Sequence, residues 1–212
     1  MTTAAPEGLE RAALLVIDVQ YLDAAPGHGV FAGPAASEDE ARARARYFER
    51  LEAMVLPNIR RLQDAFRVRG LEVVHTRIQS MTRDGRDRSP AHKRLGVHAA
   101  PGSKGAEFLP QVAPVGDELV FDKTASGVFT ATSIHYVLRN LGVKALFVAG
   151  VYTNECVSTA VRDASDLGYD TTVIGDACAS PDEALHDAAL AELNGRYARL
   201  LDTDEALREL RG

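Results

Sequence analysis

The chain has 212 residues, of which 46% are apolar, and a net charge of −6 at neutral pH. This length is enough for one well-covered domain, and we expect a single domain over residues 1–212. The acidic balance gives no basic footprint for nucleic acid, and the apolar run near the start is too short for a signal segment or a membrane span. We therefore expect a cytoplasmic protein with no membrane or nucleic-acid partner.

Short apolar runs alternate with helical patterns along the chain. Strands are predicted at residues 12–17, 71–76, 118–121, 145–149, 171–174 and 199–201. Helices are predicted at about residues 38–69, 130–141, 156–167, 182–195 and 203–211. Because most strands are apolar on both faces, we predict a three-layer α/β/α fold: a Rossmann-like, mostly parallel six-stranded sheet with helices on both faces.

The helical pattern over residues 38–69 is rich in arginine, but acidic residues are interleaved. An amphipathic helix with a solvated charged face explains this better than a nucleic-acid patch, and Pro57 is expected to kink or split it. Two long connections, residues 21–37 and 78–117, begin at the carboxyl ends of predicted strands. We expect both to line or cover a site there.

Asp18, Lys123 and Cys156 each follow or close a predicted strand. Read singly, they are a turn aspartate, a surface lysine and a small buried hydrophobe. Read together at one sheet edge, they are an acid/base group, an electrostatic partner and a nucleophile. We also expect Cys156 to lie in the first turn of a helix, where free backbone N–H groups favour the thiolate and lower the thiol pKa.

The motifs around these residues occur in a recognisable order. They are D-V-Q (Asp18 to Gln20), K-T-A-S-G-V-F (Lys123 to Phe129), G-V-Y-T-N-E-C-V (Gly150 to Val157) and G-Y-D-T-T-V-I-G-D-A-C-A (Gly168 to Ala179). With them the chain resembles the isochorismatase-like cysteine hydrolase family over about residues 10–202. The resemblance implies a catalytic triad of Asp18, Lys123 and Cys156. It also implies a cis peptide at Val151–Tyr152 and an oxyanion hole formed by the N–H groups of Tyr152 and Cys156.

The family's amidohydrolase branches include nicotinamidases, N-carbamoylsarcosine amidohydrolases, ureidoacrylate amidohydrolases and biuret-type hydrolases. The resemblance implies hydrolysis of a C–N bond in a small carbamoyl, ureido or amide compound, through a thioester and with release of ammonia. This is the class of hydrolases that act on linear amides. The family resemblance also suggests a homodimer or homotetramer, and no cofactor is expected.

A metal site is not expected. Nicotinamidases carry an Asp-x-His and a further His that hold a metal, whereas the corresponding region here reads V-V-H-T-R-I-Q-S-M. We interpret His75 as a packed strand residue, and His92 and His98 as solvated loop residues. Cys178 is expected to be structural, and both cysteines are expected to be free thiols.

The substrate-binding residues are predicted from their positions near the motifs. Tyr21, Phe129 and Tyr152 are candidates for aromatic walls, Gln20 and Asn154 for amide hydrogen bonds, and Arg77 for a substrate carboxylate. We place ureidoacrylate-like acids slightly ahead of biuret-like neutral compounds as substrates. Three alternatives stay open: a catalytically silent interaction protein on the same fold, a nicotinamidase-like hydrolase without the metal, and a nucleotide- or flavin-binding module. The last would need a Gly-rich loop after the first strand, where this chain has D-V-Q-Y-L-D.

Overall fold

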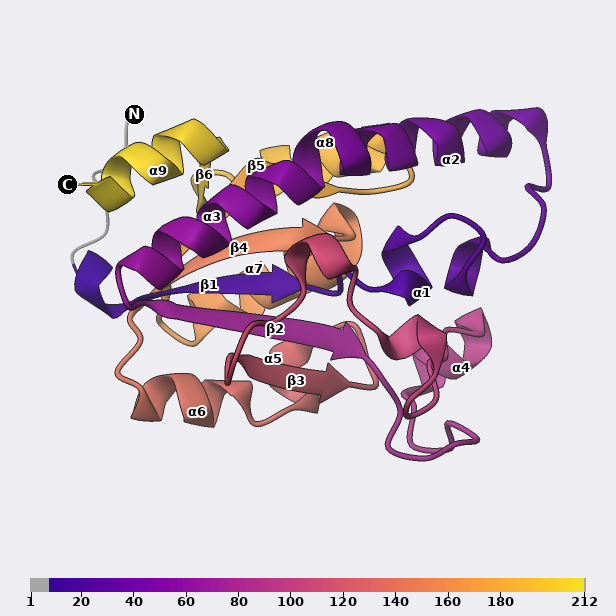
Figure 1. The fold of residues 1–212 in the computed structure, drawn as a ribbon, viewed down its shortest axis with the longest axis horizontal. Coiled ribbons are helices and arrows are strands. Elements are labelled where there is room, and N and C mark those ends of the chain that lie inside the picture. Colours follow the sequence, from indigo (N-terminus) through magenta and orange to yellow (C-terminus); the bar gives the residue numbers. More distant parts are fainter. Residues whose placement is uncertain (1–7, 212) are drawn as a thin grey trace.

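The computed structural model describes residues 8–211 and contains a six-stranded sheet in the order β3-β2-β1-β4-β5-β6 (Figure 1). Each pair of neighbouring strands is parallel. The strands are β1 (Ala12–Ile17), β2 (Glu72–Ile78), β3 (Leu119–Lys123), β4 (Ala145–Val151), β5 (Asp170–Ala179) and β6 (Arg199–Leu201). The α/β fold that the alternation of patterns predicts is confirmed.

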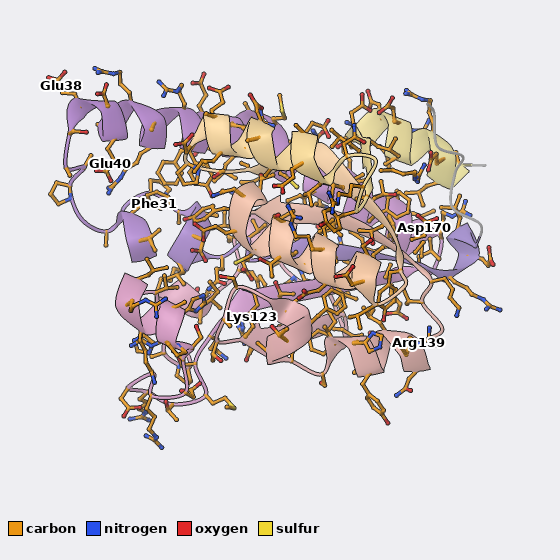
Figure 2. The ribbon with its side chains drawn as sticks, turned by 180° about the vertical axis from the view of Figure 1, so that it is seen from behind. Phe31, Glu38, Glu40, Lys123, Arg139 and Asp170 are labelled. Carbon is orange, nitrogen blue, oxygen red and sulfur yellow. The ribbon has the colours of Figure 1, made fainter. Side chains whose placement is uncertain are left out.

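Helices cover both faces of the sheet (Figures 1 and 2). One face is covered by α2 (Glu38–Arg50), α3 (Leu56–Val68) and α9 (Thr203–Arg211). The other is covered by α5 (Val128–Ala131), α6 (Ile134–Asn140), α7 (Ser158–Asp166) and α8 (Glu183–Leu193). No helix in residues 8–211 is both long enough and apolar enough to cross a membrane.

Alternate side chains of the central strand β1 enter different cores. Leu14 and Val16 belong to the core beneath α3 and α9, and Leu15 and Ile17 belong to the core beneath α6 and α7. This two-sided burial follows from the period of two along a strand. It explains why β1 reads as a continuous apolar run in the sequence.

Two predicted helices are interrupted. The long pattern over residues 38–69 forms α2 and α3, joined by a π-helical turn at Leu51–Val55, and Pro57 lies in the first turn of α3. The pattern over residues 130–141 begins earlier and divides into α5 and α6. The division falls at Thr132, whose hydroxyl donates to the Val128 carbonyl and accepts from the Ile134 N–H, so that it replaces helical backbone bonds.

The order of strands reverses between β1 and β4, which are adjacent in the sheet although distant in sequence. Ligands of open parallel sheets bind outside the carboxyl ends of the strands at such a switch point. In Figure 1 the arrowheads of β1, β2 and β3 point toward two short helices, α1 (Tyr21–Ala24) and α4 (Pro90–Leu95). Both helices belong to the long connections that were expected to cover a site.

Candidate active site

Asp18 directly follows β1 and is fully buried. Its backbone φ is 53°, a left-handed conformation that aspartate tolerates better than most residues and that no other non-glycine in residues 8–211 adopts. The Asp18 N–H donates to the Thr76 carbonyl at 3.1 Å, and the Thr76 hydroxyl donates to Asp18 Oδ1 at 2.7 Å. These bonds to the neighbouring strand β2 fix the carboxylate and leave Oδ2 for a second partner.

That partner is Lys123, the last residue of β3. β2 lies between β3 and β1, so the two backbones are about 10 Å apart and only a long side chain can join them. Lys123 Nζ lies 2.7 Å from Asp18 Oδ2 and donates to the Ala125 carbonyl at 3.0 Å. The lysine is buried inside the fold, whereas Glu38 and Glu40 lie at the outer end of α2 (Figure 2).

Cys156 lies in a π-helical turn, Thr153–Val157, between β4 and α7. Its Sγ is 3.3 Å from Lys123 Nζ, and the residue is 5% exposed. The approach to this turn depends on Gly150, which has a φ of +118° and packs on the backbone of Ile17. The peptide Val151–Tyr152 is cis. The structure therefore brings the three residues together: the Lys123 ammonium contacts both the Asp18 carboxylate and the Cys156 sulfur.

The charges of the three groups depend on one another. Burial opposes a charged Lys123, but the Asp18 carboxylate and the Cys156 sulfur outweigh it and raise the pKa of the lysine above its usual range. Burial raises the pKa of the Cys156 thiol, whereas the Lys123 ammonium lowers it and the Asp18 carboxylate raises it again. The prediction that the helix start lowers this pKa is therefore corrected, because burial of the sulfur, which no local sequence pattern indicates, has the largest effect on it.

A cavity of about 270 Å³ opens onto the sulfur. This volume suits a small molecule. Its walls come from the ends of β1, β2 and β4, from the connections that carry α1 and α4, and from the turn that carries Cys156. The lining residues are Asp18, Asp23, Val30, Phe31, Ile78, His92, Leu95, Val97, Ser126, Val151, Tyr152, Glu155, Cys156 and Pro181.

Asp23 is a site residue that the sequence reasoning missed. It lies in α1, is 5% exposed and lines the cavity, and its Oδ2 has no hydrogen-bond partner among the residues that the structure describes. Burial, and then the negative charge of Asp18, raise the pKa of this carboxyl well above its usual range. Its main-chain carbonyl accepts from the hydroxyls of Tyr47 and Tyr152, which hold α1 in place. The one available signal was the carboxylate itself, three residues after Gln20.

His92 was expected to be a solvated loop residue, and this was wrong. It lies in α4, is 3% exposed and lines the cavity. Burial, and then the charge of Lys123, lower its pKa, which favours the neutral imidazole. The signal that could have found it is Ser89-Pro90, a helix start whose Ser89 hydroxyl accepts from the His92 N–H.

Three of the predicted substrate-binding residues have protein partners instead. Gln20 donates to the carbonyls of Ile78 and Gly105, and it accepts from the Ile78 N–H at 2.5 Å. Arg77 pairs with Asp122 at 2.6 Å, and Asn154 accepts from the Ser180 hydroxyl at 2.5 Å. None of Gln20, Arg77 and Asn154 lines the cavity, so the structure does not bring these three predicted residues to the candidate site.

The three aromatic residues predicted to line the substrate site, Tyr21, Phe129 and Tyr152, lie in different parts of the structure. Tyr21 stacks against Lys104 at 3.8 Å and faces another hollow, and Phe129 packs against Tyr169 with ring centroids 5.9 Å apart. Only Tyr152 lines the cavity beside Cys156. The structure therefore does not bring Tyr21 and Phe129 to this cavity, because Tyr21 borders a different hollow and Phe129 packs against the core.

Two other histidines, His75 and His98, and the second cysteine, Cys178, do not line the cavity. His75 is buried in β2 and pairs with Glu118 at 3.1 Å, as expected of a packed strand residue, whereas His98 is only half-buried. Cys178 is buried within β5, which extends beyond the predicted strand 171–174, and both cysteines are free. Within residues 8–211, no three His, Cys, Asp or Glu side chains are grouped so that they could hold a metal ion.

Comparisons with known proteins agree with this geometry. The Isochorismatase domain family model matches residues 12–205. The chain is 34% identical to the uncharacterized isochorismatase family protein YddQ of Bacillus subtilis over 118 residues, 51% of this chain and 66% of YddQ. It is 29% identical to maleamate amidohydrolase of Pseudomonas putida over 110 residues, 52% of each protein. The chain thus spans about half the length of this second relative.

A solved structure extends the likeness to almost the whole chain. An isochorismatase family protein from Desulfovibrio vulgaris superposes with a TM-score of 0.77 at 25% identity. The superposition covers 95% of this chain and 99% of that one. The whole arrangement of sheet and covering helices is therefore shared with a protein of that family.

Proposed function

Because this chain belongs to the isochorismatase-domain family of hydrolases, we propose that it is a cysteine-dependent amidohydrolase acting on a small carbamoyl, ureido or amide compound. The observation that supports this best is the position of the Lys123 ammonium, 2.7 Å from Asp18 Oδ2 and 3.3 Å from Cys156 Sγ, at a cavity of about 270 Å³. A nucleophile, an acid/base group and a fixed cation meet where a small carbonyl compound can enter.

In the first half-reaction, Cys156 Sγ attacks the carbonyl carbon of the substrate and the thiol proton passes to Asp18. Lys123 stabilises the negative charge on whichever of the two partners lacks the proton. When the tetrahedral intermediate collapses, the C–N bond breaks and Asp18 returns the proton to the leaving nitrogen. Ammonia departs and a thioester remains on Cys156.

In the second half-reaction, water attacks the thioester and Asp18 accepts its proton. The C–S bond breaks, the acid product leaves and the thiol is restored. The negative oxygen formed in each half-reaction needs donors placed in advance, and we assign this role to the N–H groups of Tyr152 and Cys156. Losing one such donor typically costs about 10²–10³ in rate.

Support for amide hydrolysis, rather than another reaction of the family, comes from two sources. Cys156 is present and paired as a nucleophile requires. The chain also resembles maleamate amidohydrolase over the part that aligns, and the name of that relative describes hydrolysis of an amide. The enzyme class we propose is therefore that of hydrolases of C–N bonds in linear amides.

Ammonia release from a panel of carbamoyl, ureido and simple amide compounds tests the proposal. Cys156→Ser should abolish release, whereas Cys178→Ser, a change at the other buried cysteine, should retain it because Cys178 belongs to the core. Near-normal release by Cys156→Ser would contradict covalent catalysis. Silence of the wild-type protein on the whole panel would favour the catalytically silent alternative.

A further inference from the structure

The cavity contains a polar side chain that the proposed reaction does not use. Asp23 lines the cavity that also holds Cys156, but in the proposed mechanism its side chain moves no proton and positions no catalytic group. It is 5% exposed, and its Oδ2 has no partner among residues 8–211. An unpartnered buried carboxyl costs free energy of folding, so its presence here calls for a ligand.

The charged groups around the cavity exclude one kind of ligand. Among residues 8–211, the residues that line it include three acidic ones, Asp18, Asp23 and Glu155, and no lysine or arginine. The nearby Lys123 already pairs with Asp18. Arg88, on the connection that carries α4, donates to the carbonyls of Gly85 and Val97 and does not line the cavity. A substrate carboxylate would therefore meet the negative charges of Asp18 and Glu155 and, among residues 8–211, no unpaired cation in the cavity lining.

A neutral amide or ureido group finds complementary partners instead. A protonated carboxyl offers one O–H donor and one carbonyl acceptor side by side, and a primary amide offers an acceptor and N–H donors in the matching order. Burial and the adjacent Asp18 favour this protonated form of Asp23, whose pKa they raise. The buried His92, whose Nδ1 has no partner in the described part of the chain, lines the same cavity and offers a second polar contact to a ligand.

We propose that Asp23 is a substrate-binding residue that selects small neutral compounds carrying a second amide or ureido group, and that substrates bearing a carboxylate are rejected. This inference rests on the proposed function and names its substrate class. It replaces the sequence-based preference for ureidoacrylate-like acids, which depended on Arg77 binding a carboxylate.

Binding of a matched pair of ligands tests the inference without chemistry. Malonamide and malonamate differ in one end group, amide against carboxylate, and Cys156→Ala should bind either ligand without turning it over. By calorimetry, Cys156→Ala is expected to bind malonamide at least about tenfold more tightly than malonamate. The amide end of malonamide gains about one hydrogen bond, whereas the carboxylate of malonamate is repelled by the acidic residues of the cavity.

Two substitutions at Asp23, each made in the Cys156→Ala protein, test whether this residue causes the preference for malonamide. Asp23→Leu should weaken malonamide binding about tenfold and bring the two affinities close together, because the carboxyl is gone. Asp23→Asn still donates and accepts hydrogen bonds and should keep malonamide binding within a few-fold. Asp163→Asn is the matched control: Asp163 Oδ2 is also unpartnered in the described part of the chain, but this residue does not line the cavity.

A purely structural Asp23 would give a different pattern. Asp23→Leu would then lower the melting temperature and weaken both ligands equally, whereas we expect the melting temperature to be unchanged or higher when an orphan carboxyl is removed. Tighter binding of malonamate, no binding of malonamide, or unchanged selectivity in Asp23→Leu would overturn the inference. Selective binding without ammonia release by the wild-type protein would instead refute the proposed function alone. Ammonia release without selectivity would refute this inference alone.

Discussion

The Lys123 ammonium lies 2.7 Å from the Asp18 carboxylate, and both side chains are buried. Taking two charges out of water costs several kcal/mol for each ion, and the pair offsets that cost only while both members are present. The same ammonium contacts Cys156 Sγ at 3.3 Å. Folding stability and catalytic reactivity at this site therefore depend on the same three groups, and substitutions at these groups can distinguish the two effects.

Removing the cation alone should destabilise the protein and inactivate it. Lys123→Met keeps the apolar stem but leaves the Asp18 carboxylate buried without its partner, which typically costs about 3–5 kcal/mol. Denaturant unfolding measures this cost. The double variant Asp18→Asn/Lys123→Met removes both charges and should recover most of the lost stability while remaining inactive. Equal stability of the single and double variants would contradict the coupling.

Removing the base should separate thiol reactivity from turnover. Asparagine tolerates the left-handed backbone of residue 18, so Asp18→Asn should fold. Without the adjacent carboxylate the Cys156 thiol pKa should fall, and alkylation by iodoacetamide at neutral pH should become faster in a Cys178→Ser background. Turnover should nevertheless fall by about 10²–10⁴, because the proton has no acceptor. Slower alkylation would show that Asp18 does not raise the thiol pKa.

The turn that presents the nucleophile should not accept a side chain at residue 150. A Cβ added at Gly150 would lie 2.2 Å from the Ile17 carbonyl oxygen, at a φ of +118°. We expect Gly150→Ala to lose on the order of 4 kcal/mol or to fail to fold. Gly168→Ala is the matched control, since its φ is +85° but nothing lies within 4 Å of the added Cβ. Its cost should be only about 1–2 kcal/mol, and equal losses would show that backbone strain alone decides.

Asp23 should make stability depend on pH. Its pKa is raised in the folded state, whereas in the unfolded chain it is near 3.9. Between these values the folded state keeps a proton that the unfolded state releases, so stability falls as pH rises, by at most about 1.4 kcal/mol per pH unit. Below about pH 4 this contribution vanishes.

The Asp23→Asn variant lacks this titration. Its advantage in unfolding free energy over the wild-type protein should therefore grow as the pH rises above about 4, as measured by urea unfolding at several pH values. Asp163→Asn, at a much less buried carboxyl, should show a smaller change. An advantage that stays constant with pH would show that Asp23 is ionised in the folded protein.

The central part of the site was predictable because its residues terminate strands. Asp18, Lys123 and Cys156 each follow or close an apolar run, and the carboxyl ends of parallel strands meet at one edge. The apolar runs themselves predicted the strand positions, and for β1 and β6 the predicted bounds agree with the structure to the residue. Local sequence was sufficient in these cases because sheet geometry supplies the long-range information.

The rest of the cavity depends on how the two long connections fold back. Asp23 and His92 are buried only because α1 and α4 lie over the strand ends, and nothing in the local pattern of residues 21–37 or 78–117 specifies that docking. The same folding explains the wrong assignment of Gln20, whose amide is occupied by Ile78 and Gly105 from those segments. Burial of the Cys156 sulfur, which governs its pKa, was hidden for the same reason.

A covalent intermediate on Cys156 is the central claim, and intact-protein mass spectrometry tests it most directly. The protein is mixed with the amide it turns over fastest, quenched in acid within the first turnovers and digested to locate any added mass. We predict an acyl group, equal to the substrate minus ammonia, on the peptide that contains Cys156, in both the wild-type and Cys178→Ser proteins and absent from Cys156→Ser. Turnover without any acyl adduct, or an adduct on Cys178, would contradict the account.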